Sequence, residues 1–164
     1  MSKGFTLLEV LVATFFITVG ATGAFKLIQR TVVLSSGNTQ KLQAAYLAQE
    51  GMEVVRNIRD ANIVKGSKGQ SVLWTAGLEN CAQGCQADYN DQRLSPYSGI
   101  FLRSNGSSYS YDEGANTLFQ RKITVVQSGT DILAIQSEVL WNDRGIARSV
   151  KVSGEITHWF DPVP

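Results

Sequence analysis

The fold of this chain is decided near its start, by the stretch Gly4-Phe5-Thr6-Leu7-Leu8-Glu9-Val10 and the apolar run that follows it. Between Phe5 and Phe25 the only charged side chain is Glu9. A helix rises about 1.5 Å per residue, so this run spans roughly 30 Å, which matches the hydrocarbon thickness of a bilayer. The sequence therefore predicts a transmembrane helix near the N-terminus.

Two features of this stretch distinguish it from an ordinary signal peptide. A signal peptide has a charged start, a short apolar core and a cleavage site after that core. Here a leader of residues 1–4 comes before the apolar run, and a cut at that point would leave the helix in the mature protein. In addition, a lone carboxylate such as Glu9 costs about 2.5 to 3.5 kcal/mol inside lipid on insertion scales. We therefore expect a lasting anchor in which Glu9 has a partner.

These residues resemble the class III leader of type IV pilins and type II secretion pseudopilins. In that family a short basic leader ends in glycine, and phenylalanine, apolar residues and a glutamate follow. The resemblance implies that prepilin peptidase cuts between Gly4 and Phe5 on the cytoplasmic side and methylates the new amine of Phe5. It also implies that Glu9 pairs with the amine of Phe5 in a neighbouring filament subunit. The alternative is a plain single-span membrane protein with a chance acidic residue.

The next segment predicts a second, amphipathic helical part. Residues 35–38, Ser-Ser-Gly-Asn, predict a brief break or kink after the membrane segment 5–34, and Asn38 or Thr39 could cap a fresh helical turn. Within 35–64, apolar positions then recur at intervals of three or four residues, as on one face of a helix that packs on a sheet. These positions are Leu42, Ala45, Ala48, Met52, Val55 and Ile58.

The sequence of residues 44–59 also looks like that of the corresponding helix in V-type minor pilins and I-type minor pseudopilins. Both families share an Ala-rich pattern with Glu followed by Arg. Lys26 occupies the position where major pilins often carry a proline. The resemblance therefore points to a minor subunit rather than a major one.

Residues 65–116 are rich in Gly, Ser, Asn and Asp, which predicts a variable loop region with one or two short strands. Cys81 and Cys85 enclose a short segment that contains Gly84, and we expect them to form a disulfide if this region faces an oxidising exterior. We predict no zinc site, because no other cysteine exists and His158 is far away in the sequence.

Three oxygen-bearing side chains in this region, Asp88, Asn90 and Asp91, are a weak candidate for a calcium site. Carboxylate and amide oxygens are ligands that calcium takes, but the glycine and the bidentate glutamate of a calcium loop are missing at the required spacing. The alternative is a solvated turn.

The final segment, 117–164, predicts an antiparallel β-meander. Phe119, Ile123 and Val125 share one face by their spacing of two, and residues 128–131 then form a turn. The second strand places apolar residues on one face, the turn 142–145 follows, and a third strand completes the sheet. The inward residues of these last two strands are Leu133, Ile135, Val139, Trp141, Val150, Val152 and Ile156.

The composition argues against several other functions. The sequence contains no nucleophile elbow, phosphate-binding loop or metalloprotease motif, so we predict no enzyme and no cofactor. The formal net charge of +1 gives no field that attracts nucleic acid. Tyr109, Tyr111 and the basic loop 65–68 are groups of the kind that hold a single strand, but nothing in the sequence brings them together.

The predicted fold is therefore α+β and pilin-like: a long N-terminal helix, part transmembrane and part amphipathic, packed on a small antiparallel β-sheet. The predicted function is a minor pilin-like subunit in the assembly of an extracellular filament. Its partners would be other pilin subunits, prepilin peptidase and the assembly platform in the cytoplasmic membrane, with the globular part outside. The alternatives are a minor pseudopilin of a secretion or competence system, and a membrane-anchored binding protein or adhesin that never polymerises.

Overall fold

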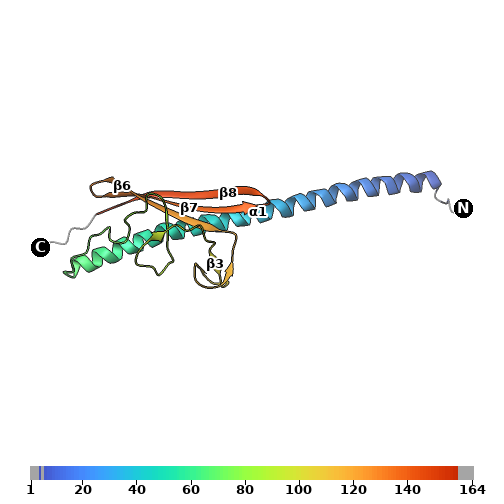
Figure 1. Ribbon diagram of the computed structural model, residues 1–164. Coiled ribbons are helices and arrows are strands. Elements are labelled where there is room, and N and C mark those ends of the chain that lie inside the picture. Colours follow the sequence, from blue (N-terminus) through green and yellow to red (C-terminus); the bar gives the residue numbers. More distant parts are fainter. Residues whose placement is uncertain (1–3, 5, 159–164) are drawn as a thin grey trace. The chain divides into compact units, whose positions relative to one another are not determined.

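The structure is a computed structural model that describes Gly4 and residues 6–158 of the 164-residue chain. One long helix, α1 (Leu7–Ser67), is followed by strands that form antiparallel sheets (Figure 1). This arrangement confirms the predicted α+β fold class. The chain divides into two compact units, Met1–Gln40 and Lys41–Pro164, and each is described by itself.

The predicted break at residues 35–38 is wrong, because α1 passes through them without interruption. Gly37 costs only about 1 kcal/mol relative to alanine in a helix interior, which is too little to end a helix that continues on both sides. Thr39 does not cap a new helix, since its hydroxyl donates to the Ser35 carbonyl at 3.1 Å within the same helix. The segments expected at 5–34 and 35–64 therefore share one helix, which ends at Ser67.

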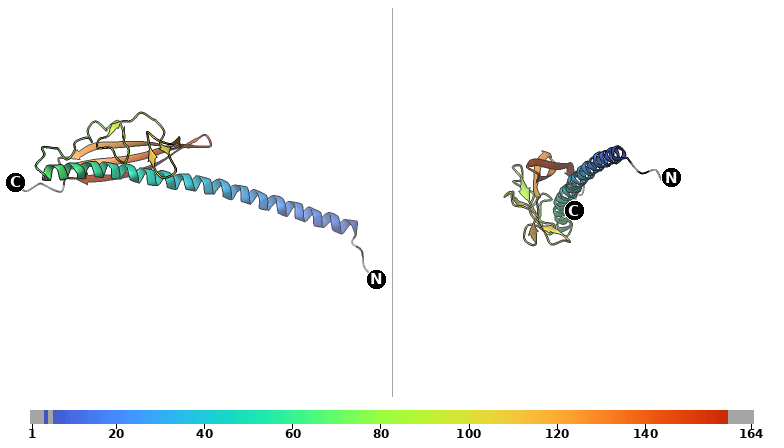
Figure 2. Two further views of the ribbon diagram at one scale, coloured as in Figure 1. Left: turned by 90° about the horizontal axis from the view of Figure 1, so that it is seen from below. Right: turned by 90° about the vertical axis from the view of Figure 1, so that its right-hand side faces the viewer.

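The second unit contains a five-stranded sheet with the strand order β2-β1-β6-β7-β8. Its strands are β1 (Cys85–Gln86), β2 (Ser95–Pro96), β6 (Gln120–Gly129), β7 (Ile132–Asp143) and β8 (Ile146–Thr157). The long strands β6, β7 and β8 lie along the part of α1 that belongs to this unit (Figures 1 and 2). They form the antiparallel meander that the sequence predicts.

The hairpin turns are tighter than predicted. The strands extend into both expected turns, so that only Thr130 and Asp131 separate β6 from β7, and only Arg144 and Gly145 separate β7 from β8. Arg144 and Gly145 both have positive φ angles, of 53° and 83°. Two consecutive residues with positive φ form the two-residue turn whose twist matches the flanking strands. Asn142 supports it by accepting the Gly145 backbone N–H at 2.7 Å.

The loop region contains more strands than the one or two predicted. Besides β1 and β2 it contributes β3 (Arg103–Ser104), β4 (Tyr109–Ser110) and β5 (Ala115–Asn116), which form a small sheet with the order β4-β3-β5. Each of these strands is two residues long. Strands this short carry no detectable periodicity, so their pairing is not visible in the sequence.

Two clusters of buried side chains join α1 to the sheet in the second unit. One cluster includes Met52, Val55, Ile58, Ile123, Val125, Leu133, Ile135 and Ile156, and the other includes Ala44, Leu47, Ala48, Leu102, Phe119, Val139 and Trp141. These clusters confirm most of the predicted inward positions. Val150 and Val152 are only partly buried, because β8 is an edge strand. Leu42 was predicted to face inward but is 56% exposed.

Candidate functional site

The N-terminal end of α1 carries the residues for which cleavage and subunit pairing were predicted. Gly4 is exposed and precedes the helix, whereas Phe5 lies outside the described residues. Thr6 caps the helix: its hydroxyl oxygen accepts the Glu9 backbone N–H at 3.3 Å, and its carbonyl accepts the same N–H at 3.1 Å. A threonine followed three residues later by glutamate is the pattern of a capping box. This role of Thr6 was not predicted, although the spacing is visible in the sequence.

The cap gives Glu9 a local stabilising role. Its exposed carboxylate lies in the first turn of α1, where the positive end of the helix dipole favours an acid by about 0.3 to 1 kcal/mol. This offsets only part of the roughly 2.5 to 3.5 kcal/mol that a lone carboxylate costs deep in a bilayer. A further partner for Glu9 is still required if this end of the helix lies in an apolar environment.

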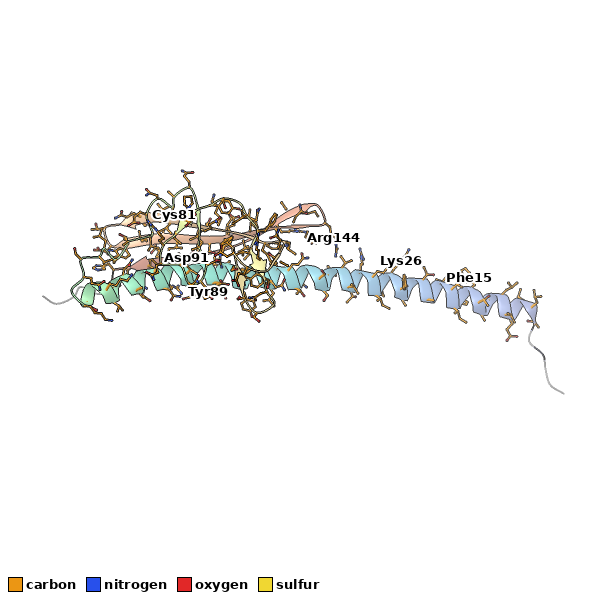
Figure 3. The ribbon with its side chains drawn as sticks, turned by 60° about the horizontal axis from the view of Figure 1, so that its bottom comes forward. Phe15, Lys26, Cys81, Tyr89, Asp91 and Arg144 are labelled. Atoms are coloured by element: carbon orange, nitrogen blue, oxygen red, sulfur yellow. A yellow bond between two sulfur atoms is a disulfide. The ribbon has the colours of Figure 1, made fainter. Side chains whose placement is uncertain are left out.

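The remainder of the first unit is an exposed apolar helix. Every residue from Thr6 to Ser36 is exposed, including large side chains such as Leu8 at 74% and Phe15 at 62%. Figure 3 labels Phe15 on this part of the helix. The threonines in it satisfy their own hydroxyl groups. Thr14, Thr18 and Thr22 donate to the carbonyls one turn earlier, at 2.9, 2.9 and 2.6 Å. Such internal bonds allow a hydroxyl to enter lipid without an unsatisfied donor.

This segment is long and apolar enough to cross a membrane once, and none of its most apolar window is buried within the chain. The core helix of a soluble protein is mostly buried, unlike this window, while a signal sequence near the N-terminus passes the same test of length and composition. Because its apolar side chains are exposed, this helix needs an apolar environment supplied from outside the chain, either lipid or other helices.

Cys81 and Cys85 form a disulfide, as predicted. Both half-cystines are buried in the first core cluster, and Cys85 lies in β1 opposite Ile123 of β6. Gly84 closes the small ring: its φ angle is +111°, and its N–H donates to the Cys81 carbonyl at 3.1 Å. The bridge therefore fixes the start of the sheet rather than an exposed loop.

The calcium candidate receives no support from the structure. The Asp88 carboxylate accepts the Tyr111 backbone N–H at 3.0 and 3.1 Å, while Asp91 accepts the Asp88 backbone N–H at 2.8 Å. Asn90 is exposed. Among the described residues, no group of three or more His, Cys, Asp or Glu side chains is arranged to hold a metal ion. Asp88 and Asp91 instead tie loop backbone together.

Burial raises the pKa of Asp88 above its usual 3.8, and the hydrogen bond from Tyr111 acts in the opposite direction. Burial also raises the pKa of the Tyr111 phenol to about 12. The phenol donates to the Arg121 carbonyl at 3.2 Å. Asp88 therefore links two parts of the loop region, and the Tyr111 phenol links the loop region to β6.

The most buried charge of the second unit was not predicted. Arg121 of β6 is fully buried, and its guanidinium lies 3.2 Å from the Glu50 carboxylate of α1. It also donates to the carbonyls of Leu47 at 3.3 Å and Ala87 at 2.7 Å. One side chain thus connects α1, β6 and the loop after β1. The signal in the sequence was its spacing of two from Phe119 and Ile123, which places it on the inward face.

The groups considered for nucleic acid do not come together in a site. Tyr109 and Tyr111 pack against the cluster that contains Ala44 and Ala48, whereas Lys65 follows Ala48 by about 25 Å along the helix. His158 directly follows β8, and its ring stacks on the ring of Trp74, with 5.4 Å between the ring centroids. These contacts give the aromatic residues a packing role.

No protein-family model, curated protein or solved structure matches this chain. Any assignment of function therefore depends on the residues and geometry described above.

Proposed function

We propose that this chain is a minor subunit of a type IV pilin-like filament, processed by prepilin peptidase and held in the cytoplasmic membrane by the first part of α1 until it assembles. The observation that carries the proposal is the apolar first part of α1, which begins shortly after Gly4, is exposed as far as Ser36 and has Glu9 in its first turn. A filament core of bundled helices and a bilayer both supply the apolar surroundings that this surface needs.

Two further observations support the proposal. A disulfide between Cys81 and Cys85 is stable in an oxidising compartment, which agrees with a second unit exposed outside the cytoplasm. Residues 44–59 resemble minor pilins and minor pseudopilins, and Lys26 replaces the proline typical of major pilins. The partners would be other pilin or pseudopilin subunits, prepilin peptidase and the inner-membrane assembly platform.

Mass spectrometry of the mature N-terminus tests the proposal. We expect a chain that begins at Phe5 and carries a methylated amine. Gly4→Leu should leave the full-length precursor in the membrane, because a side chain at the cut obstructs the peptidase, whereas Ser2→Leu in the same leader should be processed normally. A mature-sized chain from Gly4→Leu, or an unmethylated N-terminus elsewhere, would contradict the leader assignment.

A second measurement distinguishes a pilus subunit from the alternative functions, a secretion or competence pseudopilin and a membrane-anchored adhesin. A filament subunit is recovered in filaments sheared from the cell surface, and the identity of the companion subunits distinguishes a pilus from a secretion or competence filament. A membrane-anchored adhesin stays with the membrane fraction.

A further inference from the structure

Two cations follow the apolar run of α1 without an acidic residue near them in the sequence. Lys26 and Arg30 are the first charged residues after Glu9, and no Asp or Glu occurs between Glu9 and Glu50. Both side chains are exposed, and Figure 3 labels Lys26 on this part of the helix. Residues four apart lie on one helix face, where like charges repel each other. An anion shared by the two side chains would remove this repulsion.

The same helix face is hollowed beside the two cations. The hollow has a volume of about 460 Å³ and is lined by Gly23, Lys26, Leu27, Gln29, Arg30 and Val33. Gly23 contributes no side chain to this surface, and a Cβ atom at that position would meet open space. Side chains on a helix lean towards its N-terminus, so Lys26 extends back towards Gly23 and Arg30 extends back towards Lys26. The lining therefore combines two cations and an amide with apolar walls and no acid.

The hollow lies at the level of the lipid phosphates when the preceding apolar segment spans a bilayer. The segment from Leu7 to Phe25 covers about 28 Å at a rise of about 1.5 Å per residue, close to the hydrocarbon thickness of about 30 Å. When that segment spans a membrane, Lys26 lies at the boundary of the hydrocarbon and Arg30 lies about 6 Å further out, among the headgroups. Lipid phosphate is the anion concentrated at this depth.

We propose that Lys26 and Arg30 form a binding site for the phosphate of an anionic phospholipid. The planar guanidinium of Arg30 matches two phosphate oxygens, and the Lys26 ammonium adds a compact point charge. Gln29 supplies a further amide donor, and Leu27 offers apolar surface to the part of the lipid nearest the bilayer. The site requires only that the apolar helix spans a membrane, so it holds whether or not the chain enters a filament.

Lipid retention by the full-length chain tests this site. The chain is placed in nanodiscs that contain equal amounts of phosphatidylcholine and phosphatidylglycerol, and native mass spectrometry counts the phosphatidylglycerol it retains after release into detergent. A cation near the membrane surface strengthens anionic lipid binding about fivefold, so Lys26→Gln and Arg30→Gln should each weaken retention about fivefold and the double variant roughly 25-fold. Lys41→Gln removes a cation beyond the bilayer and should bind lipid like the parent.

A second pair of variants separates the shape of the site from its charge. Gly23→Leu fills the hollow while both cations remain, and it should weaken phosphatidylglycerol retention, whereas Gly20→Leu on the same exposed helix should not. The site would be overturned if the Lys26→Gln, Arg30→Gln double variant retained as much phosphatidylglycerol as the parent. It would also be overturned if Lys41→Gln lost as much phosphatidylglycerol as the single variants at Lys26 and Arg30. Displacement of the lipid by inorganic phosphate, beyond the effect of sodium chloride at the same ionic strength, would show that a free anion and not a lipid is the ligand.

Discussion

Arg121 and Glu50 form an ion pair in which the arginine is fully buried and the glutamate side chain is one-third exposed, at 33%. Burial of a guanidinium is unfavourable unless its donors are satisfied, and here two backbone carbonyls, of Leu47 and Ala87, accept from it besides the carboxylate, while its Nε–H has no partner among the described residues. The pair therefore fixes the position of α1 relative to β6 within the second unit.

Removing the arginine alone should destabilise the second unit strongly. Arg121→Met leaves the Leu47 and Ala87 carbonyls without this donor, and loss of one partner of a buried pair typically costs about 3 to 5 kcal/mol. Because Glu50 is partly solvated, we expect a value near the lower end, measured by urea unfolding of the full-length chain with tryptophan fluorescence.

The matched variant is Glu50→Gln, which retains a side-chain oxygen near the buried guanidinium and should cost less than Arg121→Met. A double-mutant cycle with both substitutions isolates the pairing energy. A coupling energy near zero would show that Arg121 stabilises the fold through its carbonyl contacts and packing alone.

Ser137 offers a stabilising substitution next to this pair. Its hydroxyl is buried and has no hydrogen-bond partner among the described residues, and an unsatisfied buried polar group costs about 1 to 3 kcal/mol. Ser137→Ala should therefore raise the free energy of unfolding by about 1 kcal/mol in the same urea measurement.

Gly51 on α1 provides the control for this prediction. A Cβ at Gly51 would collide with the Ser137 hydroxyl and would lie 3.0 Å from the Arg121 Cδ. Gly51→Ala should therefore destabilise the chain despite the better helix propensity of alanine. Adding Ser137→Ala should recover part of that loss. Simple additivity of the two substitutions would show that the two residues do not contact each other.

Asp88 should make stability depend on pH in acidic solution. Its pKa in the folded chain is raised above 3.8 by burial and by the nearby Asp91 and Asp112. A carboxyl with a raised folded pKa favours the native state when it is protonated, so this contribution is present below pH 3.8 and is lost as the pH rises through the folded pKa.

Asp88→Asn should abolish this component of the pH dependence, because the amide keeps an oxygen for the Tyr111 N–H but does not titrate. Urea midpoints of parent and variant between about pH 3 and 6 give the comparison. Asp131→Asn, in the exposed turn between β6 and β7, is the control for a general loss of negative charge, because Asp131 is not among the groups that raise the Asp88 pKa. Parallel pH profiles for parent and Asp88→Asn would contradict the prediction.

The Cys81–Cys85 bridge should contribute modestly to stability. A short closed loop restricts the unfolded chain little, so replacing both cysteines with alanine or with serine should lower the free energy of unfolding by roughly 2 kcal/mol or less. The alanine pair avoids burying new hydroxyl groups and is the cleaner measure. Processing after Gly4 should continue in both variants. Thiols that react with an alkylating reagent under non-reducing, denaturing conditions would show that the bridge is absent in the mature protein.

The sequence predicted those features that repeat with a clear period or depend on neighbouring residues. The apolar run, the inward faces of β6 and β7 and the Cys81–Cys85 bridge all belong to this group. The break at residues 35–38 was wrongly predicted because local helix breakers were given more weight than the continuous pattern on both sides. Gly37 weakens a helix but does not end one.

The residues that sequence reasoning missed are polar groups in apolar positions. Arg121 and Ser137 follow the period-two pattern of their strands as closely as Ile123 and Val139 do, and both are fully buried. A charge inside a strand is normally assigned to solvent, because burial requires a partner that only the folded chain reveals. Glu50, which lies far away in the sequence, is that partner.

Glu9 has two possible roles, and substitutions separate them. The capping-box pattern accepts glutamine as well as glutamate at this position. The pairing role needs a negative charge that meets the amine of Phe5 in another subunit, since each charge alone is costly in an apolar environment. We expect Glu9→Val and Glu9→Gln to insert in the membrane and to be cleaved after Gly4, yet both to enter filaments poorly.

Thr6→Val is the matched control, because it removes the capping hydroxyl that accepts the Glu9 N–H and leaves the charge in place. It should enter sheared filaments at nearly the parental level, as measured by quantitative mass spectrometry. Normal entry of Glu9→Gln together with poor entry of Glu9→Val would assign Glu9 to the cap instead. If Glu9→Val instead entered filaments at the parental level, filament entry would not need an ion pair between Glu9 and the amine of an overlying subunit. In that case the chain would be either a non-polymerising anchored protein or the outermost subunit of the filament.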